Sequence, residues 1–261
     1  GKADRIDLMQ DGMAELIDYK SGSISTKKMI KAAVDAGASA VKLQKRDNRS
    51  LFTSAYYDRP YNSENSFGGS YGEHREFLEF DYDQYKELQS YSNELGTIFF
   101  ATAFDFKSAD FLQNLDMPAF KIASGDLKNL PLINYLADFG KPLIISTGGG
   151  YQEDIDRVVE SLESKKAQYS ILQCTAGYPP AWNELNLGVI TTLRNKFPST
   201  VIGFSSHDNG IAMSVAAYAL GARIIEKHFT LNRTLKGTDH AFSLEPQGLS
   251  KLVRNLDRLH V

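Results

Sequence analysis

Polar side chains that can bind anions, hold metals or transfer protons recur at the ends of short apolar runs in this sequence. One run, Ala222 to Ile225, leads directly into Glu226, Lys227 and His228. A strand that ends in such residues turns them toward solvent, a partner or a ligand. The polar residues at seven such ends are Lys42 and Gln44; Thr102 and Asp105; Lys121, Ser124 and Asp126; Ser146 and Thr147; Thr175 and Tyr178; Ser205 and His207; Glu226 and His228.

Two lysines and three serines in this set have the chemistry of an anion site. Glycine-rich turns, SGD (124–126) and STGGG (146–150), accompany them. Ammonium groups, short hydroxyl donors and exposed backbone N–H groups match the oxygens of a phosphate. The sequence therefore predicts a phosphate-binding site formed by these strand ends.

Two of the five histidines, His207 and His228, end consecutive runs. Neighbouring parallel strands lie about 4.8 Å apart, so both imidazoles could reach one divalent ion. Two histidines with open coordination positions suit Mn²⁺ or Fe²⁺ better than a closed structural zinc site. The alternative is a pair of polar rim residues, and His74, His240 and His260 are each interpreted as structural.

The elements that must position these residues alternate strictly along the chain. Amphipathic helical segments separate the apolar runs at 39–44, 97–103, 118–124, 142–147, 169–175, 200–206 and 222–228. Such alternation predicts parallel strands. With a first strand at 12–17 and a last helix at 248–259, we expect one (β/α)₈ TIM barrel domain over residues 1–261, with its chemistry at the carboxyl ends of the strands.

One segment interrupts the alternation. Residues 45–82 are too long for an ordinary connection and are rich in tyrosine and phenylalanine. Those side chains need a surface to pack on, so we expect an ordered loop over the mouth of the barrel.

Composition narrows the class of protein. A formal charge of -3 and hydrophobic content of 42% over 261 residues fit a globular protein with no field for nucleic acid or an anionic membrane. No apolar run approaches the length of a membrane span, and no secretion leader precedes the first element. The single cysteine, Cys174, fits a reducing compartment, so we expect a cytoplasmic protein.

Eight segments resemble the sialic acid synthase family, the N-acetylneuraminate synthases that include legionaminic and pseudaminic acid synthases. They are VKLQ, YGEHREFLEF, ATAFD, FKIASGDL, IISTGG, QCTAGYP, GFSSHDNG and EKHFTLNRTLKGTDHAFSLEP, in this order. The resemblance implies a metal-dependent transferase that condenses phosphoenolpyruvate with an open-chain N-acylated hexosamine, such as N-acetylmannosamine. The products would be a nine-carbon 2-keto acid and phosphate, in carbohydrate or polysaccharide biosynthesis.

The resemblance also implies residue roles. Its phosphoenolpyruvate site falls on Lys42, Thr102, Lys121, Ser124, Ser146 and Ser205. Its sugar-contacting positions match Gln44, Tyr178 and Asp239, with Asp126 in place of a family glutamate. Its metal ligands match His207 and His228, and Mn²⁺ is the expected ion, with Mg²⁺ or Fe²⁺ as alternatives. Lys121 is expected in catalysis, together with a carboxylate that positions water, either Glu15 or Glu226.

Three features depart from the family pattern. The opening AEIGxNHNG reads AELIDYKSG at 14–22, and the glutamate after KIxSG is Asp126. The family also carries an antifreeze-like C-terminal domain whose arginine reaches a partner subunit. We therefore expect a homodimer in the full-length form and interpret this chain as the barrel alone. The sugar would lie between residues 71–75 and that domain.

Two other functions remain open. A 3-deoxy sugar acid synthase acting on a phosphorylated sugar would need further cations at the mouth, for which Arg46, Arg49 and Arg59 are candidates. Alternatively, the altered opening segment would leave a non-catalytic, anion-binding barrel.

Overall fold

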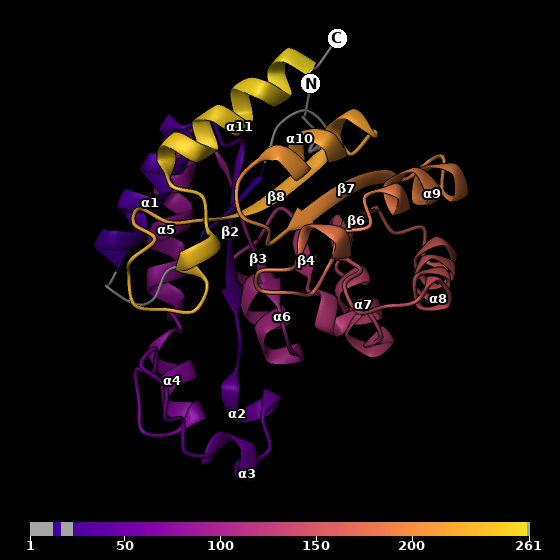
Figure 1. Ribbon diagram of the computed structural model, residues 1–261. Coiled ribbons are helices and arrows are strands. Elements are labelled where there is room, and N and C mark those ends of the chain that lie inside the picture. The colour runs from indigo at the N-terminus through magenta and orange to yellow at the C-terminus, as the bar shows by residue number, and fades with distance from the viewer. Residues whose placement is uncertain (1–12, 17–22, 260–261) are drawn as a thin grey trace.

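Parallel strands curl into a closed barrel in chain order, from β1 to β8, in the computed structural model (Figure 1). The model describes residues 13–16 and 23–259. The strands are β1 (Met13–Leu16), β2 (Ala40–Lys45), β3 (Ile98–Ala103), β4 (Phe120–Ile122), β5 (Leu143–Ser146), β6 (Tyr169–Cys174), β7 (Val201–Ser206) and β8 (Ile224–Phe229). Each lies within or beside a run expected from the sequence, which confirms the predicted α/β barrel class.

Helices follow the strands and cover the outside of the barrel (Figure 1). The principal ones are α1 (Ser23–Asp35), α5 (Tyr82–Glu94), α6 (Phe106–Asn114), α7 (Leu130–Ala137), α8 (Gln152–Ser164), α9 (Gly188–Lys196), α10 (Ala212–Ala219) and α11 (Pro246–Leu259). Their starts are encoded locally. At α5, for example, the Asp81 side chain accepts a hydrogen bond from the Gln84 N–H, while the Gln84 side chain accepts one from the Asp81 N–H.

The interior of the barrel has an apolar floor beneath a polar layer. A compact cluster of buried apolar residues forms the floor: Ala40, Phe100, Ala119, Ile144, Leu172 and Ile224. Successive side chains of a strand point to opposite faces, so the residue two positions further along again points inward. Those residues are Lys42, Thr102, Lys121, Ser146, Cys174 and Glu226. The floor therefore fixes the depth at which the polar side chains lie.

The outward-facing residues of the strands join the helices in the main hydrophobic core, which includes Val41, Phe99, Ile145 and Ile225. One charged residue lies on the outward side of β8. Lys227 is only 1% exposed and follows Ile225 by two positions. It is unusual for a cation to be buried between a barrel and its helices, and Lys227 is paired with Asp208.

The segment 45–82 is ordered, as expected, but it is not a simple loop. It contains the short helices α2 (Asn48–Leu51), α3 (Ser54–Tyr57) and α4 (Tyr71–Phe77), which lie beyond the carboxyl end of β2 (Figure 1). Its aromatic side chains pack on one another, as Tyr71 does with Phe52, Tyr56 and Tyr61. We call residues 45–82 the β2 excursion.

The β2 excursion is also attached to the segment that follows β8. Lys236 Nζ donates to the Ser66 carbonyl at 2.5 Å, and the Gly237 N–H donates to Asn65 Oδ1 at 2.9 Å. Two segments far apart in sequence thus form one side of the barrel mouth.

The predicted first strand is confirmed in its backbone, where Glu15 pairs with Lys42 on one side and His228 on the other. The side chain of Glu15, and Tyr19, Lys20 and His260, lie outside the described residues. Within the part of the chain that is described, no helix has both the length and the apolar character that crossing a bilayer requires.

Candidate active site

A cavity of about 540 Å³ opens at the carboxyl end of the barrel. This volume suits a ligand of small-molecule size. Twelve of the fourteen predicted site residues line it: Lys42, Gln44, Thr102, Lys121, Ser124, Ser146, Tyr178, Ser205, His207, Glu226, His228 and Asp239. Residues spread over nearly two hundred positions thus meet in one place.

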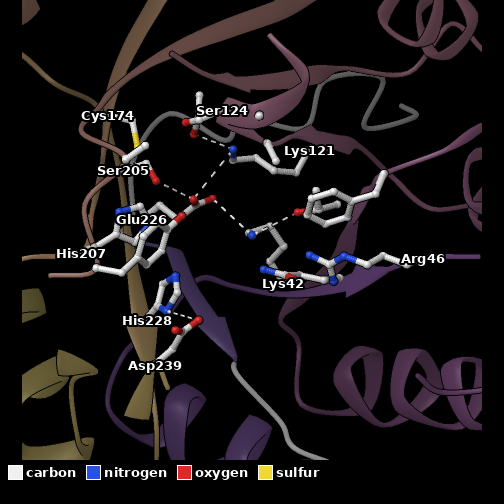
Figure 2. Close-up of a pocket in the computed structure, with 18 of the residues that line it drawn as sticks. Lys42, Arg46, Lys121, Ser124, Cys174, Ser205, His207, Glu226, His228 and Asp239 are labelled. Carbon is white, nitrogen blue, oxygen red and sulfur yellow. Dashed lines mark hydrogen bonds and ion pairs between the residues drawn. The ribbon is translucent and has the colours of Figure 1, made fainter. Parts of the chain in front are cut away.

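Glu226 lies between two buried lysines at the base of the cavity (Figure 2). Its carboxylate oxygens are 3.8 Å from Lys42 Nζ and 3.9 Å from Lys121 Nζ, and Ser205 Oγ donates to it at 2.8 Å. These Nζ to oxygen distances exceed the roughly 2.7–2.9 Å of a charge-assisted hydrogen bond. Glu226 is therefore too far from either ammonium group for a direct hydrogen bond, although its negative charge still offsets their positive charge.

Both lysines are fixed by neighbours on the next strand. Lys42 Nζ donates to Thr102 Oγ1 at 3.2 Å, and Lys121 Nζ donates to Ser146 Oγ at 2.6 Å and to the Ile122 carbonyl at 2.8 Å. Both lysine residues are almost fully buried, at 2% exposure. An anion that enters the cavity would meet preorganised donors whose side chains are held in place by their neighbours.

A tight turn brings Ser124 to the same site. The Gly148 N–H donates to Ser124 Oγ at 2.9 Å. A Cβ at position 148 would lie 2.8 Å from that oxygen and 3.1 Å from Ala176, so only glycine fits. Gly148 of the STGGG sequence is therefore explained by close packing of the turn against Ser124.

His207 and His228 face each other at one side of the cavity (Figure 2). Their ring centroids are 5.0 Å apart and their planes are perpendicular. His207 Nδ1 lies 3.2 Å from the Thr175 carbonyl, which can only accept, so Nδ1 carries the proton and the lone pair of the neutral ring is on Nε2. The Tyr178 ring packs on His207, with centroids 4.0 Å apart.

A third polar group approaches this pair from the segment after β8. Asp239 Oδ2 lies 3.9 Å from His228 Nδ1. The neighbouring His240 is buried, and its Nδ1 lies 2.7 Å from Thr230 Oγ1. Burial lowers the pKa of His240 to about 4, so this imidazole is neutral near pH 7 and has the structural role that the sequence indicated.

The two histidines have the chemistry of metal ligands. Neutral imidazoles are common ligands of divalent metals, and Asp239 offers an oxygen nearby. Among the residues that the structure describes, no cluster of three His, Cys, Asp or Glu side chains forms a closed metal site. The arrangement fits an ion with two protein ligands and several open positions.

Two predicted site residues do not join the lining. Asp126 lies on the short 3₁₀ turn η1 (Ser124–Asp126), where its side chain accepts from Asn129 Nδ2 at 3.3 Å. Burial raises its pKa, against opposing effects of Asn129 and Arg46. Glu15 is described only through its backbone, whose pairing with Lys42 and His228 places it at the edge of the site.

Three other strand-end residues have structural roles. Asp105 caps α6 through the Ser108 N–H at 2.8 Å and accepts from the Asp47 N–H at 2.8 Å. Thr147 and Thr175 each donate to a backbone carbonyl. These residues hold connections in place and do not line the cavity.

The cavity also contains residues outside the predicted set. Arg46, Tyr71 and Arg75 come from the β2 excursion, while Phe104 and Cys174 follow or end strands. The Arg46 guanidinium lies 3.6 Å from the centroid of the Phe104 ring. The signal for Tyr71 and Arg75 was the YGEHREFLEF segment, which also placed residues 71–75 beside the expected sugar.

The charge of the lining is positive. It has four cations, Lys42, Arg46, Lys121 and Arg75, against two carboxylates, Glu226 and Asp239. The whole chain has a formal charge of -3, so this positive charge is local to the cavity. The Cys174 thiol adds none, because burial raises its pKa.

Comparisons with known proteins agree with this geometry. A family model described as the NeuB family matches residues 29–261. The chain is 42% identical over 245 residues to the N-acetylneuraminate-9-phosphate synthase of Mus musculus, covering 94% of this chain and 68% of that protein. It is 36% identical over 237 residues to the N,N'-diacetyllegionaminic acid synthase of Campylobacter jejuni, covering 89% and 71%.

A solved structure shows the same fold. The crystal structure of N-acetylneuraminic acid (sialic acid) synthetase from Leptospira borgpetersenii superposes with a TM-score of 0.85 at 31% identity, covering 96% of this chain and 84% of that one. The chain spans about two thirds of the length of the mouse enzyme, 68%.

Proposed function

Because the chain belongs to the NeuB family, we propose that its cavity condenses phosphoenolpyruvate with an amino sugar to form a sialic-acid-type 2-keto acid. The enzyme is a transferase of the phosphoenolpyruvate-dependent condensing class. The observation that carries the proposal is the pair of buried lysines on either side of Glu226, which line the same cavity as the facing pair His207 and His228.

Phosphoenolpyruvate would bind to the lower layer of the cavity. Lys42 and Lys121 would hold its carboxylate and phosphate, with hydroxyl donors from Thr102, Ser124, Ser146 and Ser205. These residues lie on rigid strand ends above an apolar floor, so the site is largely preformed. The enol carbon C3 would then point toward the upper part of the cavity, where the histidines lie.

The sugar would bind above it in its open-chain form. Gln44, Tyr178 and Asp239 line the upper cavity and would contact its hydroxyl and N-acyl groups. C3 of phosphoenolpyruvate would attack the aldehyde carbon, forming the new C–C bond, while the aldehyde oxygen takes up a proton. The cation left at C2 would be stabilised by the Glu226 carboxylate and would add water.

The tetrahedral product of water addition would then break its C2–O bond and release phosphate. A carboxylate must position the water and accept its proton, and Glu226 and Glu15 are the proposed candidates. Lys121 would stabilise the departing phosphate, since its ammonium is held at the base of the cavity by Ser146.

We assign the divalent metal to His207 and His228, with Mn²⁺ as the expected ion and Mg²⁺ or Fe²⁺ as alternatives. When bound there, the metal would act as a Lewis acid on the sugar carbonyl. The chain's own part is to orient the rings. The Thr175 carbonyl and the Tyr178 ring do so for His207.

The phosphorylation state of the sugar separates two forms of this function. The name of the mouse relative implies a product phosphorylated at C9, which is C6 of the hexosamine because phosphoenolpyruvate adds three carbons. A phosphorylated sugar needs extra cations, and Arg46 and Arg75 line the cavity on the side of the β2 excursion. Arg49, by contrast, stacks on Tyr57, and Arg59 is not among the lining residues.

Our proposal also covers the domain organisation, the oligomeric state and the location of the protein. We assign residues 1–261 to one complete (β/α)₈ catalytic barrel, which the closed strand order supports. A homodimer in the full-length protein and a cytoplasmic location are proposed from the family resemblance and from the single buried cysteine.

A phosphate-release assay tests the function. It would combine phosphoenolpyruvate with N-acetylmannosamine or its 6-phosphate, with Mn²⁺ or with EDTA. We expect release that requires both the sugar and the metal. Tight phosphoenolpyruvate binding without release for either sugar would instead support the non-catalytic barrel.

A further inference from the structure

A buried ion pair joins the outer side of β8 to the segment just after β7, next in sequence to the two histidines. Asp208 follows His207, and Lys227 precedes His228. Lys227 Nζ lies 2.8 Å from Asp208 Oδ1, and both side chains are at most 2% exposed. Neither residue lines the cavity, so neither meets the substrates.

The ion pair stands where the strand pairing stops. The pairing of β7 with β8 ends at Ser206 and Lys227, and β7 itself ends at Ser206. His207 therefore lies beyond the ladder that fixes the strands above the floor. Lys227 Nζ also donates to the Asp208 backbone carbonyl at 2.6 Å, so its side chain ties down the backbone just after His207.

The residue before His207 is held by the same group. Ser206 Oγ donates a short hydrogen bond to Asp208 Oδ1, the oxygen that also accepts from Lys227. Both sequence neighbours of His207 are thus tied to the buried cation on β8, Asp208 directly and Ser206 through Asp208 Oδ1, while the ring itself contacts the Thr175 carbonyl.

Stability alone is a poor reason for such a pair. Burying two charges costs desolvation, and replacing a buried ion pair with apolar residues of similar size is often neutral or stabilising. Here the desolvation is uncompensated in part, because Asp208 Oδ2 makes no hydrogen bond within the described part of the chain. Loss of solvation on burial also lowers the pKa of Lys227, while the neighbouring Asp208 carboxylate raises it.

We propose that Lys227 and Asp208 are positioning residues, which hold His207 in the orientation that faces His228. The pair acts through the backbone on either side of His207. The inference rests on the proposed function only in that the two imidazoles are taken as metal ligands.

The decisive variant replaces both charges, K227M/D208L, because either single change would leave an unpaired buried charge. The state of the His207 ring can be measured without metal, from the imidazole ¹⁵N chemical shifts of the metal-free protein. The His207 signals are assigned by comparison with His207→Ala. In the parent we expect the Nδ1–H tautomer of His207 that the Thr175 carbonyl selects. In the double variant we expect a mixture of tautomers, with an unchanged or higher melting temperature.

Mn²⁺ affinity, measured by calorimetry with the metal alone, is the second readout. We expect about a tenfold loss in the double variant, in the range seen when groups that orient metal ligands are removed. The matched control is K45M/E79L, because Lys45 likewise donates to a carboxylate and to a backbone carbonyl, at Glu79 and Phe80, but stands on β2 and bonds to no neighbour of His207. It should leave the His207 tautomer and the Mn²⁺ affinity unchanged.

The conservative variant Ser206→Ala keeps the test decisive if the double variant does not fold. It removes one hydrogen bond to Asp208 and should shift the His207 tautomer partway. If K227M/D208L folds and keeps the parent's His207 tautomer, the proposal is overturned. If K227M/D208L does not fold, the parent's tautomer in Ser206→Ala overturns it. Absence of Mn²⁺ binding in the parent would instead overturn the metal assignment, while the tautomer comparison would still decide the positioning role.

Discussion

At the scale of single residues, Lys121 is the group whose removal should most affect anion binding. Its ammonium is buried and held by Ser146, so it loses little freedom when a ligand arrives. We expect Lys121→Ala to weaken phosphoenolpyruvate binding by about 2 to 3 kcal/mol, the usual value of a charge-assisted contact. Calorimetry measures this. Lys141→Ala, which removes a surface lysine paired with Asp116, is the control and should have no effect. Unchanged affinity in Lys121→Ala would place the anion site elsewhere.

Arg46 is the residue whose loss should separate the two candidate sugars. Its guanidinium is stacked on Phe104 at the cavity wall, where a second phosphate could be bound. We expect Arg46→Ala to raise KM for N-acetylmannosamine 6-phosphate about tenfold or more and to leave KM for N-acetylmannosamine nearly unchanged.

Arg49→Ala is the matched control for Arg46, because Arg49 makes a similar stacking contact, with Tyr57, but lies outside the cavity lining. Equal effects of Arg46→Ala on both sugars would show that Arg46 does not bind a sugar phosphate.

Residue types and spacing predicted most of the lining, because a parallel barrel gathers the ends of its strands by geometry alone. They could not show which strand-end residues serve the connections. Asp105 and Asp126 look alike in sequence, yet one caps a helix and the other bonds to Asn129. Arg75 depends on how the β2 excursion folds, and only the family resemblance of YGEHREFLEF pointed to it, not the spacing of strand ends.

At the scale of elements, Gly203 is the position on β7 where the floor has no room for a side chain. A Cβ there would lie 2.6 Å from the Ile224 carbonyl oxygen and 2.8 Å from Ile224 Cβ, so backbone would have to move. We expect Gly203→Ala to lower the free energy of unfolding by about 1 to 3 kcal/mol, as overpacking does.

Urea denaturation measures that change. Gly188→Ala is the control, since position 188 has open space and begins α9, and it should be neutral or slightly stabilising. A neutral Gly203→Ala would show that the barrel floor can adjust. Since Gly203 precedes Ser205 by two positions, the variant should also weaken phosphoenolpyruvate binding.

His74 should make the β2 excursion sensitive to acid. Burial, Arg75 and Lys236 lower its pKa from 6.5 to about 4, and its Nδ1 accepts from the Phe67 N–H at 3.2 Å. Between those pH values the unfolded chain binds a proton at this residue and the folded chain does not. The contribution of neutral His74 to stability is therefore complete above pH 6.5 and is lost as the pH falls toward 4.

His74→Phe keeps an aromatic ring beside Tyr61 and Phe67 but cannot titrate. We expect its free energy of unfolding to fall less than the parent's between pH 7 and pH 5, from a lower value at pH 7 because the Phe67 N–H loses its acceptor. Denaturation at the two pH values measures the difference. Identical pH dependence in both proteins would mean that His74 is not protected from protonation.

The order and type of the elements were predictable because apolar runs and amphipathic segments alternate without exception outside one region. That region was the β2 excursion, where three short helices of four to seven residues lack a clear period. They are stabilised by aromatic packing and by the contacts of Lys236 and Gly237, which join segments about 170 positions apart. Interactions over such separations leave no local signal.

At the scale of the whole molecule, the residues that hold the barrel together and the residues of the proposed site lie at different depths in the barrel. The apolar floor and the outer core keep the strands in register, and the polar layer above them is two residues further along each strand. A chain with a formal charge of -3 thereby presents a locally positive cavity to anionic substrates.

The proposed function is tested by following one oxygen atom through the reaction. Phosphoenolpyruvate labelled with ¹⁸O at the bridging ester oxygen would be incubated with the enzyme, Mn²⁺ and each sugar, and both products analysed by mass spectrometry. We expect a nine-carbon 2-keto acid and equimolar phosphate that retains the label, because the C2–O bond breaks, and we expect neither product from His228→Ala. Label in the organic product, or phosphate released without a nine-carbon acid, would contradict the proposed function.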